Sequence, residues 1–227
     1  FAEYLTLPQE AAIKIDDDIP FEIASLSGCG VSTGVGAAIN TAKVKPGSSV
    51  VILGGGVIGM LTVQLCRIAG ATRVVMVTRQ GEKRELAEEI GATHSFDPTT
   101  GDAIAGIAGA DGLLPGGADV VIECAGVAET MRQAPKLAKA GGTVVILGVM
   151  AAGETIEIDP FDILFRELRI IGSFVNPFTH RRAADLIATG AVRVDRLISR
   201  TVSLDEAVDV IANPPRKGEI RVLVVPN

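Results

Sequence analysis

Apolar residues along the 227-residue chain alternate between short continuous runs and runs with helical spacing. Six short runs are expected to be strands: residues 49–54, 73–77, 94–97, 119–126, 142–149 and 168–175. Continuous runs rich in Val and Ile are typical of parallel strands whose two faces are both covered. Helices are expected between them, at residues 58–68, 82–90, 101–108 and 128–139. This alternation predicts an α/β fold with a doubly wound, six-stranded parallel sheet.

The two ends of the chain do not continue this repeat. Residues 1–8 alternate apolar and polar positions as a strand does, and strand-like patterns recur at 197–204 and 219–226. Because Phe1 lies inside such a pattern, we expect the chain to begin within a larger protein. The expected parts are the end of a truncated domain over 1–30, the strand–helix repeat over 31–175 and a C-terminal return to the first domain over 176–227.

Composition narrows the classes of partner. The chain is 48% hydrophobic and 21% charged, and its net charge is -6. No run rich in Lys or Arg is present, aromatic residues make up 4% and Trp is absent, so a nucleic-acid partner is not expected. The three cysteines are widely spaced and odd in number, which favours a reducing, cytoplasmic compartment over a disulfide framework.

One uncharged segment, residues 46–66, has the hydropathy of a membrane span. Successive glycines interrupt it after a β-branched run, and similar short apolar runs recur downstream. A buried strand, a tight turn and a helix explain the segment better, so no membrane partner is expected.

A glycine-rich segment links the first predicted strand to the first predicted helix. Gly54, Gly56 and Gly59 in "GGGVIG" fit the pattern G-x-G-x-x-G, in the strand-to-helix context that dinucleotide binding requires. Gly54 permits the tight turn, Gly56 lets the backbone approach a pyrophosphate, and Gly59 lets the helix and strand pack closely. Val57 and Ile58 begin the helix, whose free N–H groups favour phosphates. We therefore expect a dinucleotide site here rather than a turn without a ligand.

The end of the second predicted strand indicates which dinucleotide binds. In a chain that binds NAD, an acidic residue about 20 residues after the glycine loop holds the ribose hydroxyls. This chain has Thr78 there, followed by Arg79. A hydroxyl can donate to a 2′-phosphate and a guanidinium can pair with it, while Lys83 and Arg84 add positive potential. The prediction is NADP, with NAD as the alternative if Arg79 is only a solvated charge.

Longer segments together resemble one known family. They are "SGCGVSTGVGAA", "VKPGSSVVILGGGVIG", "ECAG", "GGTVVILGV" and "GEIRVLV". These segments resemble the zinc-containing medium-chain alcohol dehydrogenases, most strongly between Cys29 and Gly91. The resemblance spans the whole chain. It implies that residues 1–30 are the end of a truncated catalytic domain, that 31–175 are a dinucleotide-binding Rossmann domain and that 176–227 return to the catalytic domain, whose N-terminal part is missing.

The resemblance also implies roles for individual residues. Cys29 corresponds to a catalytic zinc ligand, and Thr33 to a residue near the nicotinamide. Arg221 corresponds to an arginine that reaches the pyrophosphate, with a surface charge as the alternative. The residues implied to line the nicotinamide site are Leu147, Gly148, Val149, Ser173, Phe174 and Val175.

The chain departs from the family at the zinc site. An open catalytic zinc has three protein ligands, and only Cys29 matches one. A single thiolate should not hold zinc tightly, and Cys66 and Cys124 are interpreted as packing residues. We therefore expect zinc in the full-length parent, and we expect the fragment to bind the cofactor without turning over substrate.

The predicted function is an oxidoreductase that transfers a hydride between NADP(H) and an alcohol, polyol or carbonyl substrate, zinc-assisted in the full-length parent. A zinc-free NADPH-dependent quinone or enoyl reductase is one alternative. A dinucleotide-binding module without chemistry of its own is the other. The resemblance further implies a homodimer or homotetramer in which residues 168–175 pair across the two-fold axis.

Overall fold

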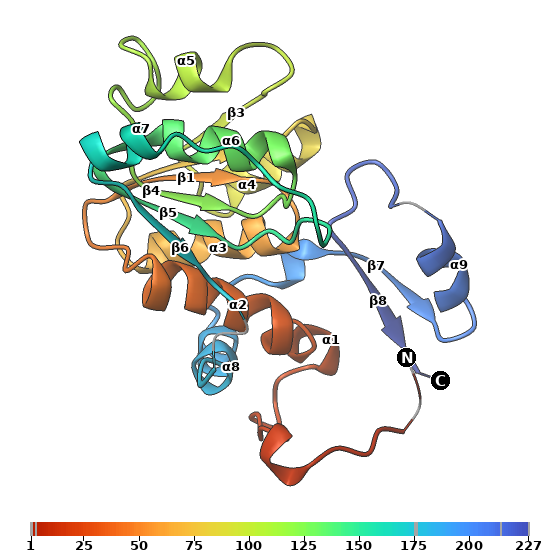
Figure 1. Ribbon diagram of the computed structural model, residues 1–227. Helices are drawn as coiled ribbons and strands as arrows, with labels where there is room; N and C mark the ends of the chain where they lie inside the picture. Colours follow the sequence, from red (N-terminus) through yellow and green to blue (C-terminus); the bar gives the residue numbers. More distant parts are fainter. Residues whose placement is uncertain (1, 3, 175–176, 214, 227) are drawn as a thin grey trace.

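The computed structural model describes residues 2, 4–174, 177–213 and 215–226. Its centre is a six-stranded sheet in the order β3-β2-β1-β4-β5-β6, and every strand pair is parallel (Figure 1). The strands are β1 (Ser49–Leu53), β2 (Arg73–Val77), β3 (His94–Phe96), β4 (Ala118–Glu123), β5 (Ala138–Ile146) and β6 (Arg169–Gly172). The predicted α/β fold with a doubly wound, six-stranded parallel sheet is confirmed.

Helices cover both faces of this sheet (Figure 1). One face carries α3 (Val57–Ile68) and α4 (Gly81–Glu89), which follow β1 and β2. The other face carries α5 (Ala103–Ala108), α6 (Ala128–Leu137) and α7 (Pro160–Phe165). The helices expected from the sequence pattern are therefore present between the strands.

Alternating side chains of the central strands enter two separate hydrophobic cores. In β1, Val50 and Ile52 belong to the core under α3 and α4, whereas Val51 and Leu53 belong to the core under α5 and α6. Successive side chains of a strand point to opposite faces, so both sets are buried only if both faces are covered. This double burial explains why the strands appear in the sequence as continuous apolar runs.

The residues before β1 form a series of short helical turns. Buried side chains of this series, including Val31 and Val35, join the core under α3. Two of the turns are π-helical, namely η2 and η3. The elements are η1 (Gln9–Ala11), α1 (Phe21–Ala24), η2 (Ser27–Val31), α2 (Ser32–Val35) and η3 (Gly36–Thr41).

The residues after β6 form a separate, smaller unit of sheet (Figure 1). β7 and β8 pair in parallel, and α9 connects them. The elements are α8 (His180–Ala188), η4 (Asp195–Leu197), β7 (Ile198–Ser203), α9 (Ala207–Ala212) and β8 (Arg221–Val225). The strands expected at 197–204 and 219–226 are present as β7 and β8, while the three-part division at residues 30 and 175 stays a prediction.

Four expected strands differ from the structure by three residues or more, and two of them, 119–126 and 142–149, end earlier than expected, at Glu123 and Ile146. Residues 2 and 4–8 form no strand, and Tyr4 is 89% exposed. An alternating segment needs a neighbouring strand for its N–H and C=O groups, and the described part of the chain offers none there. The sixth strand ends at Gly172, because its neighbour β5 ends at Ile146 directly opposite. Of the remaining predicted strand, Ser173 and Phe174 lie beyond β6, and Val175 lies outside the described residues.

The uncharged segment 46–66 forms β1, the glycine loop and most of α3, as expected. Within the described residues, no helix is long and apolar enough to cross a membrane. All three cysteines have free thiols. The cytoplasmic location and the homo-oligomer stay predictions.

Candidate cofactor-binding site

The predicted glycine loop joins β1 to α3, and two of its glycines are required by their surroundings. Gly54 has a φ of +110°, and a Cβ atom on it would lie 2.8 Å from the backbone nitrogen of Ala125. A Cβ atom on Gly59 would overlap the carbonyl oxygen of Gly54. The loop is therefore packed against the turn after β4 on one side and against its own helix on the other.

Gly56 differs from these two glycines because its surroundings are open. It is exposed, and no heavy atom lies within 4 Å of the place where a Cβ would stand. Gly56 is also the N-cap of α3, a helix of 12 residues, and provides no capping side chain. The first N–H groups of the helix, at Val57 and Ile58, have no carbonyl partner one turn earlier. An open backbone beside these donors fits the pyrophosphate of a dinucleotide.

Thr78 and Arg79 follow β2 beside this loop. A Cβ on Gly55 would lie 2.7 Å from Thr78 Oγ1, so the Thr78 side chain covers the buried Gly55. Arg79 is exposed, and its guanidinium makes no hydrogen bond or ion pair with any residue that the structure describes. Lys83, in the first turn of α4, is half-buried, and this burial lowers the pKa of its ammonium group. The described surroundings thus leave Arg79 available to a ligand.

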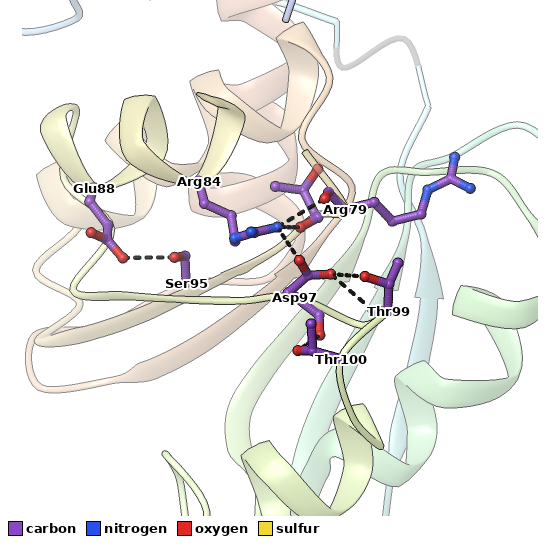
Figure 2. A network of polar contacts seen from close by, with 8 residues as sticks. Arg79, Arg84, Glu88, Ser95, Asp97, Thr99 and Thr100 are labelled. Atoms are coloured by element: carbon purple, nitrogen blue, oxygen red, sulfur yellow. Dashed lines mark hydrogen bonds and ion pairs between the residues drawn. The ribbon is translucent and has the colours of Figure 1, made fainter. Parts of the chain in front are cut away.

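Arg84 does not provide the free positive charge expected from the sequence. Its Nη1 atom lies 2.9 Å from Oδ2 of Asp97, the residue after β3 (Figure 2). The same atom donates to the carbonyl oxygens of Thr78 and Arg79, at 2.9 and 3.0 Å. The expectation for Arg84 is corrected because a carboxylate further along the chain compensates its charge.

The segment Leu147–Val149 follows β5, beside the end of β4. The N–H groups of Leu147 and Gly148 donate to the backbone oxygen of Glu123, at 3.0 and 2.8 Å. Val149 is 81% exposed. These two N–H groups are already used, so a backbone contact with a carboxamide has to come from the carbonyl groups or from Val149.

The side chain of Glu123 is fully buried beneath this segment. Its Oε1 accepts hydrogen bonds from the N–H groups of Ala125 and Gly126, each at 2.9 Å, and from the Thr130 hydroxyl at 2.7 Å. Oε2 has no hydrogen-bond partner among the described residues and lies against Gly148. Sequence reasoning gave Glu123 no role, although an acidic residue that ends the apolar run "DVVIE" is a signal of a buried, hydrogen-bonded carboxylate.

The two described residues after β6 have different environments. Ser173 is buried, and its Oγ lies 3.2 Å from Oγ1 of Thr41. Phe174 is 83% exposed. Of the residues expected to complete the nicotinamide wall, Ser173 is therefore fixed inside the protein and Phe174 is open to solvent.

A cavity of about 1010 Å³ lies between the helical turns before β1 and the β8–α9 unit. Four residues singled out in the sequence line it: Cys29, Val57, Ile58 and Arg221. Thr33, on α2, is half-buried and is not part of its lining. Residues that are more than 150 positions apart in the sequence thus meet at the start of α3, about one-quarter of the way along the chain.

The described residues do not form a metal site. Cys29 is exposed on the π-helical turn η2, a conformation that often occurs at functional sites. No group of three or more His, Cys, Asp or Glu residues in the described ranges could hold a metal ion. Burial raises the pKa of the Cys66 thiol to about 12, and burial followed by the nearby Glu123 raises the pKa of Cys124. These donors do not fit a catalytic zinc ion, and both buried thiols suit the packing role expected for them.

Comparison with known proteins places this geometry in a family context. Residues 57–189 match the profile of a family described as zinc-binding dehydrogenase. A crystal structure from Sinorhizobium meliloti 1021, described as that of a zinc-binding dehydrogenase bound to NADP, is 58% identical and superposes with a TM-score of 0.96. The match covers 99% of this chain and 65% of that one.

Two curated relatives are each 33% identical to the chain. They are the class-3 alcohol dehydrogenase of Cereibacter sphaeroides, over 216 residues, and the S-(hydroxymethyl)glutathione dehydrogenase of Paracoccus denitrificans, over 214 residues. Each alignment covers 91% of this chain and 57% of the relative. The chain therefore spans little more than half the length of the curated relatives that it matches.

Proposed function

The chain belongs to the zinc-binding dehydrogenase family, and we propose that it supplies the cofactor-binding part of an alcohol oxidoreductase that uses NADP(H). The observation that carries the proposal is the open backbone at Gly56 together with the unpaired Arg79 at the end of the neighbouring strand. The relatives, an alcohol dehydrogenase and an S-(hydroxymethyl)glutathione dehydrogenase, favour an alcohol over a quinone or enoyl substrate. The NADP in the similar solved structure supports the choice of cofactor.

In this proposal the residues around the glycine loop hold the phosphates. The N–H groups of Val57 and Ile58 and the guanidinium of Arg221 bind the pyrophosphate. At the 2′ position of the adenosine ribose, the Thr78 hydroxyl and the Arg79 guanidinium bind the phosphate, and Lys83 adds positive charge. Because a carboxylate is absent from position 78, a 2′-phosphate meets no repulsion there.

At the nicotinamide end, the chain orients the ring that reacts. Backbone groups of Leu147, Gly148 and Val149 hold the carboxamide, and Ser173 and Phe174 form the adjoining wall. A bound NADP⁺ would supply the hydride acceptor for oxidation of an alcohol at its carbinol carbon, which would give a carbonyl compound, NADPH and a proton. Thr33 stays a candidate for a position near this ring.

We propose zinc assistance only for the full-length parent, with Cys29 as one of the zinc ligands. The described residues do not supply the three donors that a catalytic zinc needs. We therefore propose that this chain binds the cofactor on its own but does not turn over an alcohol.

The test is a parallel titration of the chain with NADPH and NADH, followed by nicotinamide fluorescence. We expect NADPH to bind more tightly by about tenfold, because a charge-assisted contact with the 2′-phosphate is absent for NADH. Circular dichroism on the same sample checks that the chain is folded. Equal affinities, or tighter NADH binding, would contradict the choice of NADP, and a folded chain that binds neither would contradict the cofactor site itself.

A further inference from the structure

Arg84 is surrounded by three acceptors from two different parts of the chain, the Thr78–Arg79 turn and Asp97 (Figure 2). Its Nη1 lies 2.9 Å from Thr78 O, 3.0 Å from Arg79 O and 2.9 Å from Asp97 Oδ2. Only 23% of the Arg84 side chain and 18% of the Asp97 side chain are exposed. A phosphate could reach Arg84 as a ligand only by competing with these acceptors.

Asp97 is itself fixed by the residues that follow it. Its Oδ1 accepts hydrogen bonds from the backbone N–H of Thr99 at 2.9 Å and from the Thr99 hydroxyl at 2.6 Å. These bonds, and to a smaller extent the charge of Arg84, hold the pKa of Asp97 below its usual range. The carboxylate thus presents its other oxygen, Oδ2, to Arg84 as a permanent negative charge.

The backbone between β2 and α4 is held from both sides as a result. The N–H of Thr78 donates to Phe96 O at 3.2 Å, and the carbonyl groups of Thr78 and Arg79 accept from Arg84. The Arg79 side chain points away from Asp97 and Arg84 (Figure 2). One arginine of the pair is therefore used to fix the turn, while the other is left free.

We propose that Arg84, held by Asp97, is a positioning residue that fixes the Thr78–Arg79 turn so that the Arg79 guanidinium is presented to the ribose 2′-phosphate of NADP. The inference rests on the proposed function, because it assigns a cause to the cofactor selectivity of that site. A guanidinium suits this role because it is planar and rigid, so its Nη1 is held in a fixed orientation toward these acceptors, whereas the ammonium group of a lysine is carried on a flexible stem. A binding group is effective only when its backbone is held in place by such support.

Substitution of Asp97 distinguishes a positioning role of Arg84 from direct phosphate binding by Arg84, because the two roles predict changes of opposite sign in NADPH affinity. In Asp97→Asn, Arg84 loses its counter-charge. If Arg84 only positions the turn, NADPH affinity falls by about tenfold while NADH affinity changes by less than about twofold. If Arg84 is itself a phosphate ligand, the released guanidinium binds NADPH more tightly than in the original chain. Both affinities are measured by nicotinamide fluorescence on the full 227-residue chain.

Two further variants complete the experiment. Arg84→Lys keeps the charge but replaces the rigid guanidinium with an ammonium group on a flexible stem, so we expect it to lose as much NADPH selectivity as Asp97→Asn. Glu88→Gln is the matched control, because Glu88 also joins α4 to β3, through Ser95 Oγ at 2.7 Å, without touching the turn (Figure 2). We expect Glu88→Gln to keep the original selectivity.

The inference would be overturned if Asp97→Asn binds NADPH as tightly as the original chain or more tightly. It would also be overturned if Arg84→Lys keeps the selectivity, or if Glu88→Gln loses it to the same extent. An original chain without preference for NADPH contradicts the proposed function instead, so the two failures are distinguishable. Thermal unfolding of each variant shows whether a lost affinity comes from lost folding.

Discussion

The Gly59→Ala variant is expected to lose cofactor binding and about 3 kcal/mol of stability. A methyl group on Gly59 would overlap the carbonyl oxygen of Gly54, which is backbone and cannot rotate away. Either α3 moves away from β1, or the glycine loop opens, and both changes remove the helix start from its place beside β2. Urea unfolding measures the loss of stability, and NADPH fluorescence measures the loss of binding.

Gly56→Ala is the matched control in the same loop. Gly56 has a φ of -81°, which alanine adopts freely, and no atom lies within 4 Å of its Cβ position. Stability should therefore change by less than about 1 kcal/mol, while the methyl group obstructs the approach of a pyrophosphate and weakens NADPH binding. A Gly59→Ala chain as stable as Gly56→Ala would show that helix and strand are not in the close contact described here.

The Glu123→Ala variant is expected to lose about 3 kcal/mol of stability. Two effects of opposite sign compete, because removal of a buried carboxylate with an unpartnered oxygen is favourable, whereas three donors lose their acceptor. The part-buried N–H groups of Ala125 and Gly126 lose a charged acceptor at a cost of about 1–3 kcal/mol each, so the loss of these bonds dominates, while the Thr130 hydroxyl still reaches Val127 O at 3.0 Å. The affected turn supports Leu147 and Gly148, so the nicotinamide end of the site should loosen as well.

Glu123→Gln separates the hydrogen bonds of Glu123 from its charge. The amide oxygen can accept the same three bonds, so we expect a loss of about 1 kcal/mol, clearly smaller than for alanine. Glu129→Ala, on the exposed surface of α6, should change stability by less than about 0.5 kcal/mol. If urea unfolding gives the same midpoint for Glu123→Ala and Glu129→Ala, the buried network has no stabilising role.

The sheet could be predicted from the sequence because its central strands are buried on both faces. Double burial favours an apolar residue at nearly every position of β1, and a short continuous run of this kind is typical of a central parallel strand. The alternating pattern of residues 1–8 carries less information, because it specifies one buried face without specifying which strand covers it. Within the described residues no strand pairs with it, and the predicted strand is absent.

Only those parts of the candidate site whose residues are adjacent in the sequence could be predicted. The glycine loop and the Thr78–Arg79 turn are local patterns with a defined context. The role of Arg84 depends on a partner after another strand, Asp97. The partners of the Glu123 side chain are close in the sequence, but a pattern of residue types does not show which donors turn toward it. The π-helical turn around Cys29 likewise has no local signal that distinguishes it from an ordinary helix.

The central claim is that Arg79 recognises the 2′-phosphate, and the most direct measurement is a titration of Arg79→Ala with NADPH and with NADH. We expect NADPH affinity to fall by about tenfold and NADH affinity to stay unchanged, because only NADPH has the group that Arg79 contacts. Arg73→Ala, at the exposed start of the same strand, should change neither affinity. An Arg79→Ala chain that keeps the original affinity for NADPH, or that loses both cofactors equally, would contradict the account.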